Sequence, residues 1–454
     1  MSHVIRKFLY KNFILLYKVS RATSYRFTES GFLTLSVLTA AAVFGLDTRQ
    51  THAYMLFSIL FVLLLISLVI VNFKRLKIEA YRSLPEYCTN GIPLKYDIII
   101  SNKKNHVIRN LVIMDELTNT LPSFREFSYY KDDSDRNLNI FDRMIGFPRM
   151  ISLINKKRGA DIRPEIIEKI GKNETIKKSL TITPSRRGYL YFNQTVYACC
   201  DPLGLMRKPK RFKNNQPLLA LPRQYRVPEI SLHGNRKYQQ GGINLASSIG
   251  EFGDFHSLRD YRSGDPKRKI HWRTYARKNK PVVKEFHDEY FSRTGMVLDT
   301  FIDKDNSLLF EDAVSVATSI VLSHKQQDSL LDLMFINDKA YRTTSGRALG
   351  DERGLIELLA CVDTMPLNQF QKLASLTQQY ARETSAFIFI LLDWDEQRKE
   401  MVRQLKLRNI PILVIVITDQ SNNFKNDYDC MGNYKNNFWL LEAGDIQNSL
   451  DAIS

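Results

Sequence analysis

Residues 54–73 read YMLFSILFVLLLISLVIVNF, twenty residues without a charged side chain. An α-helix needs about 20 apolar residues to cross a hydrocarbon core of roughly 30 Å, so this stretch predicts a transmembrane helix. A shorter apolar run at residues 31–46 precedes it, and only residues 47–53 separate the two. We therefore expect a transmembrane helical hairpin over residues 31–73.

Basic side chains flank this hairpin on its two outer sides. Residues 1–30 carry six of them against one acid, whereas the connecting loop carries one, Arg49. The bases that follow the hairpin are Lys74, Arg75, Lys77 and Arg82. Because basic flanks stay in the cytoplasm, we expect both termini on the cytoplasmic side of the cell (inner) membrane, with 1–30 as a basic cytoplasmic segment. A cleaved signal peptide, with residues 40–42 near the cut, is disfavoured by the second full-length apolar run.

The formal net charge of +17 raises the question of nucleic acid binding. Much of that charge lies beside the apolar runs, where membrane topology explains it, so we expect no nucleic acid partner. The five cysteines are odd in number and lack CxxC spacing, which argues against a disulfide framework or a zinc site and favours a reducing compartment.

Beyond the membrane segment the pattern changes twice. Short β-type runs between turn residues predict a β-sandwich over 78–222, with an inserted segment near 125–178. Over 293–454, apolar strand runs without alternation take turns with helical patterns, which predicts a sheet covered on both faces. The expected fold class is α+β multidomain: two N-terminal transmembrane helices, a β-sandwich and a doubly wound α/β domain, with a charged connector at 223–292.

The densest pattern is GEFGDFHSLRDYRSGDPKRKIHWRTYARKNKPVVKEFHDE, at residues 250–289. One interpretation is a network of ion pairs that locks the β-sandwich onto the α/β domain, with Trp272 as a packed anchor, because arginine pairs carboxylates through two hydrogen bonds. A second is a docking surface for a partner protein. A third is acid–base catalysis, but no nucleophile elbow, phosphate loop or HExxH motif accompanies these residues.

The same segment closely resembles the signature of the domain-of-unknown-function 58 family. Its signature and interaction positions here are Gly253, Asp254, Arg259, Asp260, Tyr261, Gly264, Asp265, Arg268, His271, Trp272 and Arg273. The pieces SRRGY at 185–189 and DPLGL at 201–205 also match, as does the apolar hairpin. The resemblance implies a β-sandwich followed by a von Willebrand factor A-like domain. It also implies a partnership with a MoxR-type AAA+ ATPase in assembling or maturing a client protein.

An A-like domain raises the question of a metal-ion-dependent adhesion site, which uses Asp-x-Ser-x-Ser after the first strand. Here Phe301 and Asp303 stand where the serines would be, and a register that begins at Asp303 moves the site off the strand end. Oxygen ligands would favour Mg²⁺. With the signature displaced we expect no cofactor, and backbone hydrogen bonds to the strand-end aspartates instead. The candidate metal ligands are Asp299, Asp303 and Asp393, with Thr343 or Thr344 as the threonine.

Together these patterns favour a non-enzymatic, membrane-tethered adaptor on the cytoplasmic side. Its expected partners are the ATPase, the client protein and the lipid bilayer. The first alternative is a membrane-bound hydrolase that uses Asp254, Asp260, Asp265 and His271. The second is a metal-dependent adhesion-type binding protein.

Overall fold

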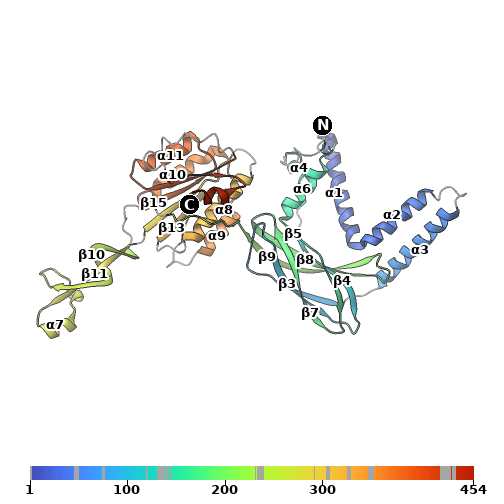
Figure 1. Cartoon of the computed structure of the whole chain (residues 1–454), viewed down its shortest axis with the longest axis horizontal. Helices are drawn as coiled ribbons and strands as arrows, with labels where there is room; N and C mark the ends of the chain where they lie inside the picture. The colour runs from blue at the N-terminus through green and yellow to red at the C-terminus, as the bar shows by residue number, and fades with distance from the viewer. Residues whose placement is uncertain are drawn as a thin grey trace. The chain divides into compact units, whose positions relative to one another are not determined.

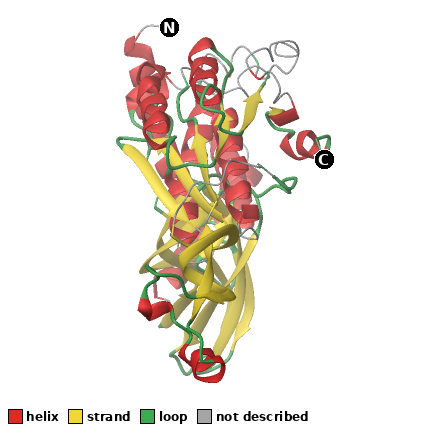
Figure 2. Ribbon diagram, turned by 90° about the vertical axis from the view of Figure 1, so that its left-hand side faces the viewer, coloured by secondary structure: helices red, strands yellow, loops and turns green. Residues whose placement is uncertain are grey.

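The computed structural model describes residues 3–44, 51–73, 77–118, 121–129, 139, 142, 145–230, 232, 240–290, 292–302, 307–324, 329–345, 352–419, 431 and 436–453. The chain divides into two compact units, Met1–Leu221 and Pro222–Ser454. Both units combine helices with strands, which are coloured red and yellow in Figure 2.

Three helices open the first unit: α1 (His3–Arg26), α2 (Glu29–Phe44) and α3 (Thr51–Phe73). Among the described residues, one helix is long and apolar enough to cross a membrane, the 22 residues His52–Phe73 of α3. The apolar helix α2 has 16 residues, which is short of the ~20 that a span needs. α2 and α3 pack side by side (Figure 1).

Nine strands of the first unit form two sheets that share one core. The strands are β1 (Ile78–Ser83), β2 (Tyr87–Thr89), β3 (Leu94–Asn102), β4 (Ile108–Leu117), β5 (Ala160–Ile162), β6 (Glu165–Ile170), β7 (Thr175–Pro184), β8 (Gly188–Cys200) and β9 (Arg207–Leu221). One sheet has the order β1-β3-β7-β5 and the other β2-β9-β8-β4-β6. Alternate residues point inward, so that Ile98 of the first sheet and Leu111 and Phe192 of the second lie in the same buried cluster. This arrangement is the β-sandwich that the sequence predicts.

The segment between β4 and β5 contains two helices, α4 (Phe124–Tyr129) and α6 (Phe147–Arg158). α6 ends at Gly159, whose φ of 78° is the left-handed conformation that favours glycine at a helix end. The buried face of α6 packs with Phe127 of α4 and Phe13 of α1. The predicted insertion at 125–178 is therefore too long, because β5, β6 and the first residues of β7, 175–178, lie within it and belong to the two sheets.

The second unit contains a six-stranded sheet of order β14-β13-β12-β15-β16-β17, in which only β14 runs antiparallel to its neighbour. Its strands are β12 (Ser292–Leu298), β13 (Ser329–Ile336), β14 (Ala340–Ser345), β15 (Ala386–Leu391), β16 (Ile412–Thr418) and β17 (Phe438–Glu442). Its helices are α8 (Ser307–His324), α9 (Glu352–Cys361), α10 (Phe370–Tyr380), α11 (Glu396–Lys406) and α12 (Ile446–Asp451). Ile388 and Phe389, neighbours in β15, belong to different buried clusters, so both faces are covered, as the unbroken apolar runs predict.

The order of the strands reverses direction between β12 and β15, because the chain builds outward from β12 on both sides. Such a point is where open α/β sheets usually place a ligand, beyond the carboxyl ends of the strands. Asp299 follows β12 directly, so the fold places it at this point.

The predicted connector is mostly a two-stranded antiparallel hairpin of β10 (Gln240–Asp260) and β11 (Val282–Tyr290). Between the two strands lie a short 3₁₀ turn, η2 (Lys267–Lys269), and the helix α7 (Trp272–Lys278). The segment that joins the strands, residues 261–281, is called the hairpin tip below.

Candidate interaction site

An arginine at the end of β10 ties the hairpin tip to both strands. The Arg259 guanidinium donates to both Asp265 carboxylate oxygens, at 2.7 and 2.8 Å, through its two terminal nitrogens. Its Nε donates to Glu285 Oε1 of β11 at 2.8 Å. Because the guanidinium is a rigid plane, these three bonds set the position of the turn relative to the strands.

The turn itself is closed around Asp265. The backbone N–H of Arg262 donates to Asp265 Oδ2 at 2.8 Å, and the Asp265 N–H donates back to the Arg262 carbonyl at 3.1 Å. Gly264 has a φ of +108°, a backbone conformation that residues other than glycine rarely adopt. The hydrogen bonds from Arg259 and from the Arg262 backbone lower the pKa of Asp265 to about 2. A carboxyl group that is so strongly held as its anion is a poor general acid.

His271 is also held by the tip. Its backbone N–H donates to the Val282 carbonyl at 2.8 Å, and its Nδ1 lies 2.6 Å from the Thr274 hydroxyl. Tyr261 closes the base of the tip, where its N–H donates to the Pro281 carbonyl at 3.0 Å. Gly253 and Asp254 lie in β10, but the Asp254 side chain is outside the described part of the chain.

The tip presents an aromatic pair to solvent. Trp272 is 61% exposed and Tyr275 38% exposed, and their rings meet edge to face with centroids 5.9 Å apart. Within its own unit Trp272 is therefore an exposed residue and packs only on Tyr275 among the described aromatic side chains. The interdomain ion-pair network is wrong for Arg259 and Asp265, whose pairs join parts of the hairpin itself.

Basic side chains surround the aromatic pair. Residues 261–280 contain eight bases and one acid, Asp265. The bases are Arg262, Lys267, Arg268, Lys269, Arg273, Arg277, Lys278 and Lys280. Since Asp265 is paired with Arg259, the tip is strongly positive. The sequence pattern does not mark Glu285, because its pairing with Arg259 depends on the register of β10 and β11.

At the reversal point of the sheet, an arginine occupies the place that a metal would need. Arg398 of α11 is 1% exposed, and its Nε donates to Asp299 Oδ2 at 2.6 Å. The other Asp299 oxygen accepts the Phe301 N–H at 2.9 Å. Another Arg398 nitrogen donates to Asp395 Oδ2 at 2.7 Å. Burial raises the pKa of Asp299 and the guanidinium opposes that shift; at this distance the two groups form a buried ion pair.

Of the remaining predicted ligands, those that the structure describes do not complete a metal site. Asp393 is exposed and accepts the N–H of Trp394 at 2.7 Å, while Asp303 lies outside the described residues. The Thr344 hydroxyl donates to Asp332 at 2.6 Å. Asp332 lies in the interior of β13, away from the end of β12 that Asp299 follows. Within the described ranges no three His, Cys, Asp or Glu side chains gather as metal ligands do. The residues present therefore do not fit an adhesion-type metal ion, because a guanidinium already fills the coordination space of Asp299.

Comparison with known proteins shows what this part of the chain is similar to. Residues 257–418, which include Arg259, His271 and Asp299, match the family described as "Protein of unknown function DUF58". The Uncharacterized protein YeaD of Bacillus subtilis (strain 168) is 28% identical over 196 residues. That similarity covers 40% of this chain and 46% of YeaD, so the chain matches less than half of its relative.

Solved structures also resemble this chain, at low similarity. A Salmonella alpha-2-macroglobulin mutant is 8% identical, with 40% of this chain and 9% of that chain covered and a TM-score of 0.19. A putative late embryogenesis abundant protein is 11% identical, with 36% and 86% covered and a TM-score of 0.18. Similarities of this size define neither a shared fold nor a function.

Proposed function

We propose that this protein is a membrane-tethered adaptor on the cytoplasmic side that binds a partner protein through its hairpin tip. The observation that carries the proposal is the exposed Trp272–Tyr275 pair on a turn held by Arg259. Tryptophan, tyrosine and arginine are the residues that most often dominate binding energy at protein interfaces. A partner that fits the tip has an apolar pocket for the Trp272 ring and an acidic rim for the bases around it.

The tether in this proposal is the α2–α3 hairpin, with both spans in the inner membrane. The apolar length of α3 and the basic residues on the two outer flanks support it. A tether confines the tip to a thin layer above the membrane and raises its effective concentration toward any partner that is also held there.

The partner that we propose is a MoxR-type AAA+ ATPase, with its client protein as the third component. The support is the family match together with what the resemblance of the signature implies. The strand order of the second unit, with one antiparallel edge strand, supports an A-like domain as its scaffold. In this proposal the A-like domain works without a metal ion, since Asp299 is paired with Arg398.

The alternative function is a hydrolase that uses the acids and histidine of the hairpin. The described contacts favour it less, because Asp265 is bonded through both oxygens to Arg259 and His271 is bonded to Thr274. An Asp265→Asn variant that keeps the wild-type melting temperature and loses a measurable hydrolytic activity would favour the hydrolase over the adaptor.

The Trp272→Ala variant is expected to bind a MoxR-type ATPase of the same organism at least about 30-fold more weakly than the wild type. Loss of a central interface aromatic costs about 2 kcal/mol or more, and 1.4 kcal/mol is a factor of ten. The measurement is a titration of the detergent-solubilised full chain with the ATPase. Tyr191→Ala is the matched control, because Tyr191 is 55% exposed in the other unit. An unchanged Kd for Trp272→Ala, or a wild-type chain that binds no such ATPase, would contradict the proposal.

The Arg259→Gln variant is expected to return the pKa of Asp265 from about 2 toward its usual value near 3.9. A lowered pKa means that the carboxylate stabilises the hairpin above the unfolded-state pKa and that this contribution fades as the pH falls toward 2. Carboxyl ¹³C chemical shifts recorded across this pH range measure the pKa directly. In wild type and variant alike, Asp445, an acid outside the hairpin, serves as the internal reference. An Asp265 pKa that is the same in both proteins would show that Arg259 does not hold it.

A further inference from the structure

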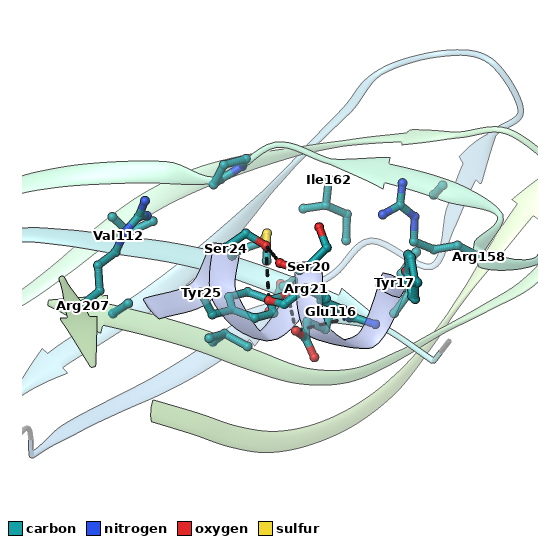
Figure 3. Close-up of a pocket in the computed structure, with 17 residues that line it drawn as sticks. Tyr17, Ser20, Arg21, Ser24, Tyr25, Val112, Glu116, Arg158, Ile162 and Arg207 are labelled. Atoms are coloured by element: carbon teal, nitrogen blue, oxygen red, sulfur yellow. Dashed lines mark hydrogen bonds and ion pairs between the residues drawn. The ribbon is translucent and has the colours of Figure 1, made fainter. Parts of the chain in front are cut away.

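A cavity of about 470 Å³ lies in the first unit between α1 and the outer face of the five-stranded sheet (Figure 3). Ligand pockets typically measure about 300–1,000 Å³, so one small molecule or head group fits. The sheet supplies an apolar floor that includes Met114 of β4 and Val196 of β8. The helix supplies hydroxyl groups, among them Ser20 and Ser24. The cavity therefore has one apolar wall, formed by the sheet, and one polar wall, formed by the helix.

Two arginines stand at opposite ends of the labelled group in Figure 3, Arg158 and Arg207. In the described structure the Nε of each is buried and lacks a hydrogen-bond partner. Their terminal nitrogens have some partners: one of Arg158 donates to Asn155 Oδ1 at 3.2 Å and lies 3.6 Å from Asp161 Oδ1, and one of Arg207 donates to the Phe27 carbonyl at 3.1 Å. Native proteins rarely leave buried donors of a charged group without an acceptor, because the desolvation is not offset.

The carboxylates of the cavity do not supply the missing acceptor, since both have other partners. Glu116 accepts a hydrogen bond from Tyr25 and lies 3.3 Å from an Arg21 nitrogen. Asp115 is bonded to Arg82 at 2.7 Å. Burial and the hydrogen bond to Glu116 raise the pKa of Tyr25 to about 12, so its phenol remains a donor. The buried Nε–H groups of Arg158 and Arg207 therefore have no carboxylate acceptor among the residues that line the cavity.

The Arg207 end of the cavity adjoins the apolar helices. Phe27, which joins α1 to α2, forms an antiparallel bridge with Met206. Next along β9, Lys208 Nζ donates to the carbonyl of Asn72 at the end of α3, at 2.6 Å. This end therefore lies at the boundary where the proposed membrane hairpin meets the first unit.

We propose that the cavity binds the head group of one anionic phospholipid from the inner membrane. The phosphate lies at Arg207, next to the helices, and the hydroxyl groups of the head group follow Ser20 and Ser24 toward Arg158. A lipid fits better than a soluble phosphate compound because the Arg207 end adjoins the apolar helices and the floor is apolar. This inference rests on the membrane attachment proposed above and is independent of partner binding at the hairpin tip.

Native mass spectrometry of the full chain in detergent tests the proposal. We expect one phosphatidylglycerol to be retained, with an affinity at least about tenfold higher than that of zwitterionic phosphatidylcholine. Arg207→Gln and Arg158→Gln should each weaken phosphatidylglycerol binding about tenfold and leave phosphatidylcholine unchanged. Arg109→Gln, an exposed arginine outside the cavity, is the matched control. Ser24→Leu, which fills the polar wall without removing a charge, should also expel the lipid.

Equal retention of phosphatidylglycerol by Arg207→Gln, Ser24→Leu and the wild type would overturn the lipid site. The lipid site would also be overturned if glycerol 3-phosphate raised the melting temperature of the wild type as much as phosphatidylglycerol does, because the ligand would then be a soluble anion. A chain that leaves the membrane fraction on carbonate washing overturns the membrane attachment. A chain that stays in that fraction and shows no preference for the anionic lipid overturns this inference alone.

Discussion

Replacement of Arg398 by methionine is expected to lower the free energy of unfolding of the second unit by about 3–5 kcal/mol. Methionine keeps most of the side-chain volume but leaves the Asp299 carboxylate, which is 0% exposed, without its counter-charge. The carbonyl of Phe301, which accepts a bond from Arg398 at 2.9 Å, also loses a donor. Breaking one side of a buried pair is costly because the other charge remains buried.

All three tryptophans, Trp272, Trp394 and Trp439, lie in the second unit, so their fluorescence follows the unfolding of that unit alone in denaturant. Arg403→Met is the matched control on the same helix, because the Arg403–Glu400 pair is about half exposed and should contribute less than about 1 kcal/mol. The Arg398→Met/Asp299→Leu double variant should recover much of the loss, since no charge is left unpaired.

Thermal unfolding of the wild type with and without Mg²⁺ distinguishes an Asp299 site occupied by arginine from a metal site. Mg²⁺ or a chelator should leave the wild-type melting temperature unchanged, because a ligand stabilises only the state that it binds. A rise with Mg²⁺ in the wild type would mean that the cation displaces the guanidinium, contrary to the geometry.

The sheet of the second unit could be predicted because each of its strands is marked by a short run of consecutive apolar residues. The runs at 386–391 and 412–417 are wholly apolar and wholly buried, and strands of this kind need both faces covered. The position of Asp299 at the end of a strand could be read in the same way. Its partner could not, because Arg398 is 99 residues away and reaches Asp299 only after α11 has packed.

In the first unit, by contrast, the role of a helix could not be predicted from the local sequence. α1 reads as a basic segment, because bases alternate with its apolar residues, and only tertiary packing of Phe13 against α4 and α6 reveals the buried face. The hairpin tip is ambiguous for another reason. An arginine and an aspartate pair equally well within a turn or between domains, so the composition of 250–289 could not decide whether Trp272 is packed or exposed.

The Asp115→Ala variant is expected to destabilise the β-sandwich by about 3–5 kcal/mol. Asp115 and Arg82 are both fully buried, and the two side chains form a bidentate pair with bonds of 2.7 and 2.8 Å. The hydroxyls of Tyr96 and Thr195 also donate to Asp115, at 2.8 and 2.5 Å. Removing the carboxylate therefore leaves a buried cation and two buried hydroxyl donors without their acceptor inside an apolar core.

Hydrogen exchange of the β3, β4 and β8 amides measures this loss, because the slowest amides of a core open only with the whole unit. Glu79→Gln is the control: its pair with Lys103 is about half exposed, so its loss should change protection by no more than about 1 kcal/mol. The Arg82→Met/Asp115→Leu variant should be more stable than Asp115→Ala, since it removes both charges. If Asp115→Ala exchanged like the wild type, the buried pair would not stabilise the sandwich. A simultaneous shift in tryptophan fluorescence would show that the two units unfold as one, because unit 1 contains no tryptophan of its own.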